Sequence, residues 1–565
     1  MEGQKLTTSL SSLKRKDTLA RLQAEEFDLL IIGGGITGAG IALDAANRGM
    51  RTALVEMQDF AAGTSSRSSK MIHGGLRYLK KFEVKLVSQV GRERAIVYEN
   101  GPHVTTPEWM ILPIYEGAEF GKFLTSVGLR VYDSLAGVKK TERRKMLSRD
   151  ETLRLEPKFK QEGLLGGGMF VEYRSDDARL TIEVMKEAAA QGATVINYTK
   201  VTNFIYKDDK AAGVETVDQL NGQTSRIYAK KIINAAGPWV DTLREKDHSL
   251  GGKHLLLTKG IHLVFDQSVL PLKQSVYFDT PDGRMILMIP RNGKMYVGTT
   301  DTAYNGDYAH PRITDEDIDY ILQAIQFIFP EWPLSASDIE SSWAGLRPLI
   351  HQTDKGTSEI SRKDEVWESP SGLLTIAGGK LTGYRKMAET IVDLVAEKFE
   401  QEEHKRFSPC ETKQLPISGG HVGGSKNFNV FLKIKTAEGV KLGLSAERAQ
   451  MLVRKYGSNI DQVYNYLQAN EEKAKKYGLP ADIYAQVLYA VTDEAACTPI
   501  DFFARRTGAL LFDIDWVREW KWPVIEVMND MLSWTSEQKE QFTADLEKRL
   551  HEATVPMQEA VPAAE

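Results

Sequence analysis

The chain has 565 residues and a mass of 63.2 kDa, and at about 150 residues per domain this length allows two to four domains. Hydrophobic residues make up 42%, charged residues 26%, and the mean hydropathy is −0.33, which excludes a disordered chain and an integral membrane protein. The net charge is −5, from 72 Lys and Arg against 77 Asp and Glu, so the chain lacks the broad positive charge that binds nucleic acid. We therefore expect a globular protein with no nucleic-acid partner.

The cysteine and hydropathy patterns indicate the compartment. The sequence contains two cysteines, Cys410 and Cys497, too few for a disulfide framework or a thiolate metal cluster. No run approaches the roughly 20 apolar residues of a membrane-spanning helix, and no signal-peptide core precedes the first strand. We expect a cytoplasmic protein in a reducing compartment, without a metal site.

Residues 1–26 precede the first predicted strand and mix lysine and arginine with leucine. This pattern allows two interpretations, a weak interfacial helix at a membrane surface or a solvated N-terminal extension. The solvated extension is favoured because residues 7–12 are mostly polar and the amphipathic stretch is short.

A strand, a helix and a second strand follow in order. Residues 27–32 form a continuous apolar run, typical of a parallel strand that is buried on both faces. Apolar and small residues then recur at helical spacing over 37–47, Gly49 ends the helix, and 51–56 has the pattern of a strand. We predict a complete βαβ unit.

Mixed helix and strand patterns continue to about residue 250 and include a long amphipathic helix over 177–190. Residues 253–300 are rich in strands, as expected of an antiparallel sheet that roofs a pocket, and α/β patterns then return until about residue 400. The acidic stretch at 315–319 imitates a calcium loop but lacks the glycine at its sixth position. We interpret it as a solvated helix start.

Residues 401–425 form a linker, in which a charged run gives way to Pro416 and four glycines. Beyond the linker, 426–565 is almost entirely helical in pattern. Thr498, Pro499 and Asp501 form a helix start, with a capping hydroxyl, a proline in the first turn and a carboxylate at the third position. We predict a helical cap domain.

The turn after the first strand carries the glycine pattern of a dinucleotide site. Gly33, Gly35 and Gly38 form GxGxxG, and Glu56 ends the second strand. The first glycine allows a tight turn, the second lets the backbone approach a pyrophosphate, and the third lets helix and strand pack closely. A carboxylate at Glu56 suits two ribose hydroxyls and repels a 2′-phosphate, so we expect FAD or NAD and not NADP.

Two observations favour FAD. A flavin disulfide reductase that uses NAD(P)H normally has a second GxGxxG, and none occurs in this sequence, so we expect electrons to arrive from a substrate. Two further apolar strands, 232–237 and 373–377, end in small residues, which let a bulky ligand approach the backbone. Three converging strands indicate one long dinucleotide that lies across the sheet.

Several blocks of sequence resemble a single family. They are GITGAGIALDAANRG, TSSRSSKMIHGGLRYL, AAGPWVD, TKGIHLVF, VGTTDT, AGLRPL and AGGKLTGYRKMAE. In this order they resemble the FAD-dependent glycerol-3-phosphate dehydrogenases, the respiratory type that does not use nicotinamide. The resemblance runs from about residue 27 to beyond 510. Gly383 stands where this family often has a second threonine, and residues 1–26 lengthen the usual N-terminus.

The resemblance implies an α/β fold with a Rossmann-like FAD-binding domain, an antiparallel-sheet substrate domain and the C-terminal helical cap domain. The FAD-binding domain is expected in segments 27–115, 175–250 and 340–400, interleaved with substrate-domain segments 116–174 and 251–339. FAD is expected to bind without a covalent bond. The residues expected to contact it are Gly33, Gly34, Gly35, Thr37, Gly38, Glu56, Thr64, Ser65, Ser66, His73, Gly74, Gly75, Gly237, Trp239, Gly378, Gly379, Lys380, Leu381 and Thr382.

For the substrate, the resemblance implies oxidation of the C2 hydroxyl of sn-glycerol 3-phosphate to dihydroxyacetone phosphate, with the flavin N5 as hydride acceptor. The side chains expected to bind the substrate and its phosphate are Arg77, Tyr78, Arg347, Lys380 and Arg385. For each single cation, a surface salt bridge is an equal alternative.

His262 is the first choice for the catalytic proton acceptor, because imidazole titrates near neutral pH. A purely structural histidine is the alternative. Arg347 and Lys380 are rival catalytic groups, since a cation near C2 stabilises the developing alkoxide and a desolvated lysine can itself act as a base.

The resemblance also implies that electrons pass to membrane quinone, through peripheral contact with the inner face of the cell membrane. A homodimer is left open. The nearest alternative is a glycerol-3-phosphate oxidase that reduces O₂ to H₂O₂, although we see no inserted segment of the kind such oxidases carry. Two more distant candidates are a related flavoprotein acting on an amine or a 2-hydroxy acid, and a non-catalytic flavin-binding module.

Overall fold

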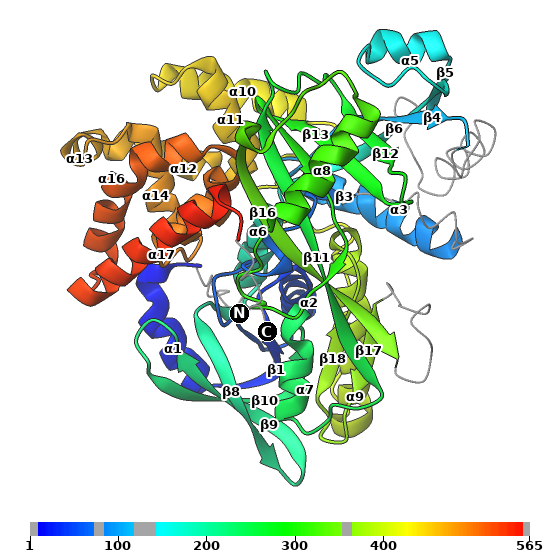
Figure 1. Cartoon of the computed structure of the whole chain (residues 1–565). Helices are drawn as coiled ribbons and strands as arrows, with labels where there is room; N and C mark the ends of the chain where they lie inside the picture. Colours follow the sequence, from blue (N-terminus) through cyan, green and yellow to red (C-terminus); the bar gives the residue numbers. More distant parts are fainter. Residues whose placement is uncertain (1–9, 73–83, 118–142, 353–363, 558–565) are drawn as a thin grey trace, which may run out of the picture.

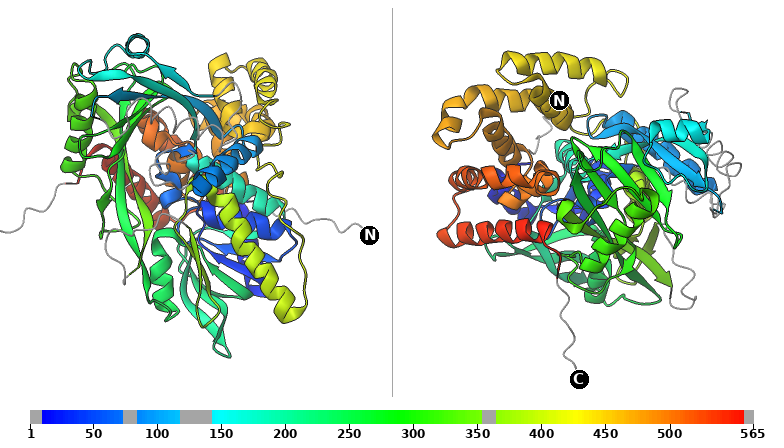
Figure 2. Two further views of the ribbon diagram at one scale, coloured as in Figure 1. Left: turned by 90° about the vertical axis from the view of Figure 1, so that its right-hand side faces the viewer. Right: turned by 45° about the horizontal axis from the view of Figure 1, so that its top comes forward.

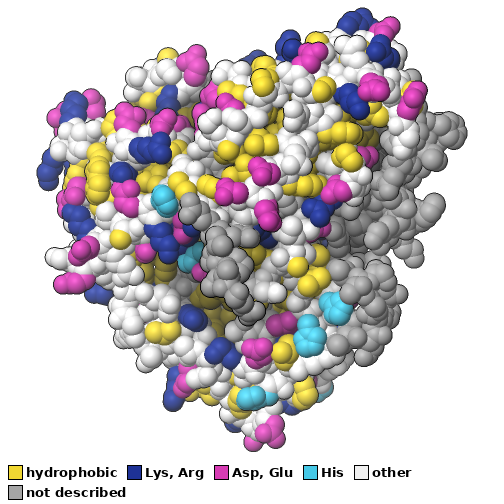
Figure 3. Space-filling model, in the orientation of Figure 1, with side chains coloured by type: hydrophobic (Ala, Val, Ile, Leu, Met, Phe, Trp, Pro, Cys, Tyr) yellow, Lys and Arg dark blue, Asp and Glu magenta, His cyan; other side chains and the backbone are white. Residues whose placement is uncertain are grey.

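The computed structural model describes residues 10–72, 84–117, 143–352 and 364–557. They form a mainly parallel sheet with its helices, a second sheet above it and a group of helices from the C-terminal part of the chain (Figure 1). Figure 3 shows basic and acidic side chains interspersed over the described part of the same face.

The first sheet is centred on β1 (Glu26–Ile32), which is buried along six of its seven residues and pairs in parallel with its neighbours on both sides. The strands lie in the order β17 (Glu365–Glu368), β18 (Leu374–Ala377), β10 (Thr224–Asn234), β1, β2 (Thr52–Val55) and β7 (Thr194–Ile196). A hairpin of β8 (Thr199–Lys207) and β9 (Lys210–Asp218) extends from β10. The predicted strand at 27–32 is therefore confirmed as a central parallel strand.

Three helices cover one face of this sheet, α2 (Ile36–Asn47), α6 (Asp177–Ala190) and α9 (Tyr384–Glu403), and their apolar side chains form one core with the strands. The β8–β9 hairpin and α7 (Val240–Lys246) supply apolar side chains to the core on the other face. The helices predicted at 37–47 and 177–190 are confirmed, and so is the βαβ unit.

The second sheet is antiparallel in every described pair except β12 with β4. Its strands lie in the order β15 (Thr302–Ala303), β11 (Lys253–Asp266), β14 (Lys294–Gly298), β13 (Met285–Arg291), β12 (Ser275–Asp279), β4 (Thr105–Tyr115), β6 (Leu164–Ser175) and β3 (Met71–Ile72). β16 (Ile339–Gln352) pairs with β11, and β5 (Lys145–Leu147) pairs with β6.

α8 (Asp315–Ile328) packs on the second sheet. Thr314 caps this helix, because its hydroxyl accepts a hydrogen bond from the Asp317 amide and the Asp317 carboxylate accepts one from the Thr314 amide at 3.0 Å. The predicted helix start at 315–319 is confirmed, although Asp317 is buried rather than solvated.

The strand pairing places strands from the segments predicted for the FAD-binding domain in both sheets. β3 and β4 fall in segment 27–115 and β16 falls in segment 340–400, both predicted for the FAD-binding domain, yet all three strands belong to the second sheet. The strand patterns in these segments are correct. The sheet that each strand joins depends on partners far away in the sequence, as where β16 places Arg347 opposite Thr258 of β11, and local patterning carries no such information.

The C-terminal region is helical, as predicted, and lies beside both sheets (Figure 2). Its helices are α10 (Phe428–Lys441), α11 (Ala446–Tyr456), α12 (Ile460–Ala469), α13 (Glu471–Lys476), α14 (Ala481–Asp493), α15 (Ala509–Phe512), α16 (Ile514–Leu532) and α17 (Ser536–Thr554). The remaining α-helices of the described residues are α1 (Arg15–Ala24), α3 (Val84–Asn100) and α5 (Arg149–Leu155).

The predicted helix start at Thr498 leads into one π-helical turn, η9 (Asp501–Arg506). The Asp501 carboxylate accepts hydrogen bonds from the amides of Cys497 and Thr498 at 2.8 and 2.9 Å, so the predicted carboxylate caps the turn. The predicted capping hydroxyl of Thr498 does not cap it. The Thr498 hydroxyl lies 3.2 Å from the hydroxyl of Tyr198 in the first sheet. The segment that begins at Thr498 therefore connects the cap domain to the first sheet.

Residues 10–26 are not the wholly solvated extension that was predicted, although most of their side chains are exposed or half-buried. Leu10 and Leu22 are buried, and the Ser12 hydroxyl donates to the Ala496 carbonyl at 2.7 Å. Arg15 forms an ion pair with the buried Asp218 carboxylate at 2.9 Å. Of the polar residues at 7–12 that suggested solvent contact, Ser12 is instead satisfied by a partner in the folded protein.

Candidate functional site

The turn between β1 and α2 has the close backbone packing of a pyrophosphate cradle. Gly33 adopts φ +117°, and a Cβ on it would lie 2.5 Å from the Ala235 carbonyl oxygen. A Cβ on Gly38 would lie 1.9 Å from the Gly33 carbonyl oxygen. Both positions require glycine, and the close approach of helix and strand expected from the sequence is present.

Glu56 and Ser65 brace this turn. The amide of Gly34 donates to Glu56 Oε2 at 2.6 Å, and the amide of Ile36 donates to Ser65 Oγ at 2.9 Å. Burial raises the pKa of Glu56 above its ordinary value, and the amide of Gly34 opposes that effect. A buried carboxylate at the end of β2 is suited to accept hydrogen bonds from ribose hydroxyls.

A cavity of about 720 Å³ opens at the carboxyl ends of β1, β2, β10 and β18, the place where open α/β sheets bind ligands. The predicted cofactor residues that line it are Gly33, Gly35, Thr37, Glu56, Thr64, Ser65, Gly237, Trp239, Gly378, Gly379, Lys380 and Leu381. The cavity thus extends from the end of β2 to the glycines that follow β18. Its length and its glycine cradle fit a dinucleotide such as FAD.

The other predicted cofactor residues fall into two groups. Gly34, Gly38, Ser66 and Thr382 do not line this cavity, although Gly34 and Gly38 shape the turn and Ser66 lines a smaller adjoining cavity. The other three cofactor residues, His73, Gly74 and Gly75, lie outside the described part of the chain, and so do the predicted substrate residues Arg77 and Tyr78.

His262 lies in β11, on the roof where it was predicted, and is 1% exposed. Its Nε2 lies 2.9 Å from the Ser69 hydroxyl, and its ring stacks on Trp343 with centroids 4.6 Å apart. Burial, and then the charges of Arg347 and Lys70, lower the pKa of His262 well below the usual range. The imidazole is therefore neutral at physiological pH.

Arg347 lies in β16 near the same histidine. Its guanidinium donates to the Thr300 carbonyl at 3.1 Å and to the Thr299 hydroxyl at 2.9 Å. A Cβ on Gly260 of β11 would lie 2.1 Å from Arg347 Nη2, so glycine at this position makes room for the guanidinium. The structure brings Arg347 and His262 together on the roof, and places Lys380 in the cavity wall.

Arg385 does not join these residues. It is buried in α9, and its guanidinium donates to both oxygens of Glu93 at 2.6 and 2.8 Å and to Glu389 at 2.6 Å. These carboxylates satisfy its charge, and it does not line the cavity. The sequence predicts Arg385 within the first turn of a helix, but this position does not show which face of α9 meets the ligand.

Sequence reasoning missed the part of the cavity wall that comes from the cap domain. Its residues are Thr498, Ile500, Arg505, Gln541, Phe542, Asp545 and Arg549. The helical pattern of 426–565 predicted the cap helices, but nothing in it showed which face of the cap meets the first sheet.

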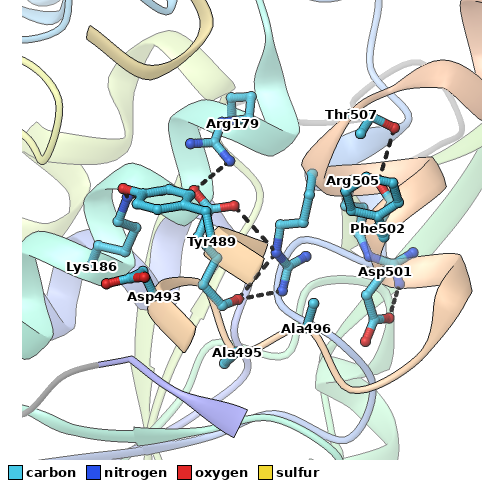
Figure 4. Close-up of polar contacts among 12 residues, drawn as sticks. Arg179, Lys186, Tyr489, Asp493, Ala495, Ala496, Asp501, Phe502, Arg505 and Thr507 are labelled. Atoms are coloured by element: carbon cyan, nitrogen blue, oxygen red, sulfur yellow. Dashed lines mark hydrogen bonds and ion pairs between the residues drawn. The ribbon is translucent and has the colours of Figure 1, made fainter. Parts of the chain in front are cut away.

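A buried ionic cluster holds the cap against the first sheet (Figure 4). Figure 4 shows Arg505 beside Asp501, with which it pairs at 2.6 Å. Arg505 also pairs with Asp59, which follows β2, and Arg179 of α6 pairs with Glu494 at 2.7 Å. All five side chains are at most 8% exposed. Breaking a buried pair leaves an uncompensated charge, so the cluster fixes the cap next to the cofactor cavity.

A dinucleotide-sized cavity at the carboxyl end of a parallel sheet, lined by a GxGxxG turn and Glu56, is typical of a flavin oxidoreductase. His262 and Arg347 lie on the neighbouring antiparallel sheet and are not part of the cavity lining. Residues 28–385 match the model of the family FAD dependent oxidoreductase, and 410–539 match that of the C-terminal domain of alpha-glycerophosphate oxidase. With the relatives described next, these matches show that the chain belongs to the FAD-dependent oxidoreductases, within the family of aerobic glycerol-3-phosphate dehydrogenases.

The aerobic glycerol-3-phosphate dehydrogenase of Bacillus subtilis (strain 168) is 61% identical over 549 residues, which cover 97% of this chain and 99% of that protein. Its counterpart in Staphylococcus aureus (strain USA300) is 56% identical over 547 residues, 96% and 98% of the two chains.

Among solved structures, the glycerol-3-phosphate dehydrogenase from Bacillus halodurans complexed with FAD is similar, with a TM-score of 0.85 and 50% identity over 98% of this chain and 100% of that one. The L-alpha-glycerophosphate oxidase from Mycoplasma pneumoniae shares the fold, with a TM-score of 0.54 and 20% identity over 68% of this chain and 97% of that one.

Two further findings concern only the described residues. None of their helices combines the length and the apolar character that crossing a membrane requires. In the same part of the chain, no three His, Cys, Asp or Glu side chains come together as a set of metal ligands.

Proposed function

We propose that the protein oxidises sn-glycerol 3-phosphate to dihydroxyacetone phosphate with bound FAD and passes the electrons to membrane quinone. The main observation in support is the cavity, which is lined by the GxGxxG turn and Glu56 at one end and by Lys380 at the other. Relatives at 56% and 61% identity are aerobic glycerol-3-phosphate dehydrogenases, and a relative at 50% identity is complexed with FAD. When bound, FAD supplies the acceptor for the hydride that leaves C2 of the substrate.

Arg347, Lys380 and Arg77 are the proposed clamp for the substrate phosphate. The hydrogen bonds from Arg347 to Thr299 and Thr300 support this role, because they hold the guanidinium in one orientation before substrate arrives. Lys380 lies in the cavity wall directly after the two glycines that follow β18. Arg77 enters the proposal from the sequence alone, since it lies outside the described residues.

His262 is the proposed proton acceptor for the C2 hydroxyl. The low pKa keeps the imidazole neutral, and the Ser69 hydroxyl and the Trp343 ring fix its orientation. A phosphate dianion bound nearby raises the proton affinity of this imidazole and so offsets the effects of Arg347 and Lys70. Lys380 is the rival base, because it lies in the cavity wall.

An anaerobic titration tests the proposed reaction. Glycerol 3-phosphate should bleach the oxidised flavin absorbance, whereas no bleaching with any polyol phosphate would favour a non-catalytic flavin-binding module. A substrate screen in which amines or 2-hydroxy acids reduce the flavin faster than glycerol 3-phosphate would favour the related oxidoreductases.

The electron acceptor is tested under air. If quinone is the acceptor, the protein should reduce a quinone analogue and form little hydrogen peroxide. One molecule of peroxide for each molecule of substrate oxidised would favour the oxidase. Because quinone is dissolved in lipid, the protein should also sediment with quinone-containing vesicles of anionic phospholipid. Analytical ultracentrifugation of the holoenzyme shows whether the protein forms a homodimer.

A further inference from the structure

Helix α17 of the cap domain lines the cofactor cavity with one of its faces. Gln541, Phe542, Asp545 and Arg549 all contribute to the wall. Positions 541, 545 and 549 are four residues apart, so they lie above one another on one side of the helix. Three of these four side chains are polar, which suits a wall that contacts a polar ligand.

α17 is held in place at both of its ends. At its start, Gln538 Nε2 donates to the Leu220 carbonyl at 2.8 Å, and Leu220 itself lines the cavity. At its end, the Ser342 hydroxyl of β16 donates to the Ala553 carbonyl at 3.1 Å. The helix therefore spans from the first sheet to the second, and the cavity-lining face is fixed.

Three arginines meet where the cap closes the cavity. Arg67, Arg505 and Arg549 all line the cavity and also line the smaller cavity that adjoins it. Arg505 is balanced by its two aspartates. Arg67 donates to the Ala309 carbonyl at 2.9 Å, and among the described residues no carboxylate lies within ion-pair distance of it.

The pKa values of Arg67 and His310 are both lowered, in part by the positive charges of this cluster. Burial, and then the charges of Arg549 and Arg505, lower the pKa of Arg67 to about 10. Burial and the charge of Arg549 likewise lower the pKa of His310, against the opposing effect of Asp307. Like charges crowded in a partly buried wall destabilise one another, and a bound anion relieves that cost.

The balance of charge around the whole cavity has the same sign. The acidic residues among its described lining are Glu56, Asp59 and Asp545. The lysines and arginines are Arg67, Lys200, Lys246, Lys380, Arg505 and Arg549. A dinucleotide brings a doubly charged pyrophosphate, and guanidinium groups bind phosphate oxygens in pairs.

We infer that Arg67 and Arg549 bind the phosphates of FAD, so that the C-terminal domain completes the cofactor site. This inference rests on the FAD assignment of the proposed function and extends it to a domain outside the Rossmann-like fold. Glu552, which accepts a hydrogen bond from Arg549, also lies 3.5 Å from Arg312. It therefore keeps a cationic partner when Arg549 is replaced.

The test measures FAD release from the holoenzyme. On dilution, the rise in flavin fluorescence should be roughly ten- to a hundredfold faster for Arg549→Gln and for Arg67→Gln than for the wild type, the range expected for the loss of one hydrogen bond to a charged group. Arg549→Lys should restore part of the affinity. Salt should accelerate release from the wild type more than from Arg549→Gln, because screening acts on the charge that the variant lacks.

Arg518→Gln is the matched control, because Arg518 is an exposed arginine of α16 that pairs with the exposed Asp515 at 3.0 Å. It should release FAD at the wild-type rate. Circular dichroism of each variant before dilution reports folding. An Arg549→Gln protein that is folded and retains FAD as well as the control overturns the inference.

A free phosphate is the other source of the same ligand chemistry. Inorganic phosphate is titrated into the FAD-loaded proteins by calorimetry. If it binds to the wild type but not to Arg549→Gln, and if both proteins release FAD at the same rate, the arginine cluster binds a free anion and the inference is overturned. Flavin bleaching by glycerol 3-phosphate is measured on the same samples. A wild type that holds FAD but is not bleached contradicts the proposed reaction and leaves this inference standing.

Discussion

The imidazole of His262 lies flat against the indole of Trp343, with ring centroids 4.6 Å apart and planes inclined by 10°. The two residues are directly opposite each other in the antiparallel register of β11 and β16. Trp343 Nε1 donates to the Ser68 carbonyl at 3.3 Å, and His262 Nε2 bonds to the Ser69 hydroxyl. This cross-strand pair therefore holds Ser68 and Ser69 against the second sheet.

His262→Ala should lower kcat by about a hundred- to ten-thousandfold, the range for loss of a general base, with a much smaller effect on KM. Steady-state kinetics with an artificial electron acceptor measure both constants. Tyr296→Phe is the control, because the Tyr296 hydroxyl donates to the Ser69 carbonyl at 3.2 Å without a hydrogen bond to His262. A raised KM with kcat unchanged would assign His262 to binding instead.

Arg347→Met should raise the KM for glycerol 3-phosphate far more than it alters the flavin content, because it removes a cation from the proposed clamp and leaves the cofactor cavity lining intact. Arg77→Ala should behave in the same way. Arg385→Met should destabilise the fold instead, since it leaves the buried Glu93 carboxylate without its bidentate partner. Loss of flavin in step with the rise in KM would move Arg347 to the cofactor site.

Gly38→Ala should lower the flavin content of the purified protein, because the new Cβ would lie 1.9 Å from the Gly33 carbonyl oxygen and distort the turn. The ratio of flavin to protein absorbance measures the loss. Gly383→Ala is the matched control, since Gly383 has φ −92° and no heavy atom within 4 Å of its added Cβ. Equal flavin content in the two variants would contradict the proposed cradle.

Arg15→Met should lower the free energy of unfolding by about 1–3 kcal/mol, because it leaves the Asp218 carboxylate buried without its ionic partner. Urea denaturation measures the change. The double variant with Asp218→Asn should recover part of the loss, and Lys16→Met, at an exposed position of α1, should change stability by less than about 0.5 kcal/mol. An unaffected Arg15→Met protein would show that the ion pair of Arg15 with Asp218 contributes nothing to stability.

Stability should fall as the pH drops below about 6.5, the ordinary pKa of histidine. Burial, and then the charges of Arg179, Lys186 and His421, lower the pKa of His103 well below that value. Between the two pKa values the unfolded chain binds a proton that the folded chain does not, so acid favours unfolding, by up to about 1.4 kcal/mol per pH unit for one histidine.

His103→Gln should therefore lose less stability than the wild type between about pH 7 and about pH 5. Urea denaturation at both pH values measures the difference. The exposed His551 provides the control variant, His551→Gln, which should retain the wild-type dependence. Identical slopes for all three proteins would show that His103 titrates normally.

Local patterns in the sequence were sufficient for the elements that depend on neighbouring residues. Strand β1 was predictable from the apolar run at 27–32, and the cradle and the cofactor class from the glycines that follow it and from Glu56. Strand burial and tight turns depend on residues that are consecutive in the sequence. The helical cap and the start of α8 were predictable for the same reason. The resemblance to known dehydrogenases then supplied the reaction.

The tertiary structure alone decided which of these residues meet. β16 joins the second sheet, Arg385 is neutralised by Glu93, and Arg15 binds Asp218, each through a contact between residues far apart in the chain. The cap reaches the cofactor cavity in the same way, since Arg549 and Arg67 are brought to one wall only when α17 packs across both sheets. Hydropathy and spacing indicate whether a side chain is buried, but the packing of the whole chain determines which residue it contacts.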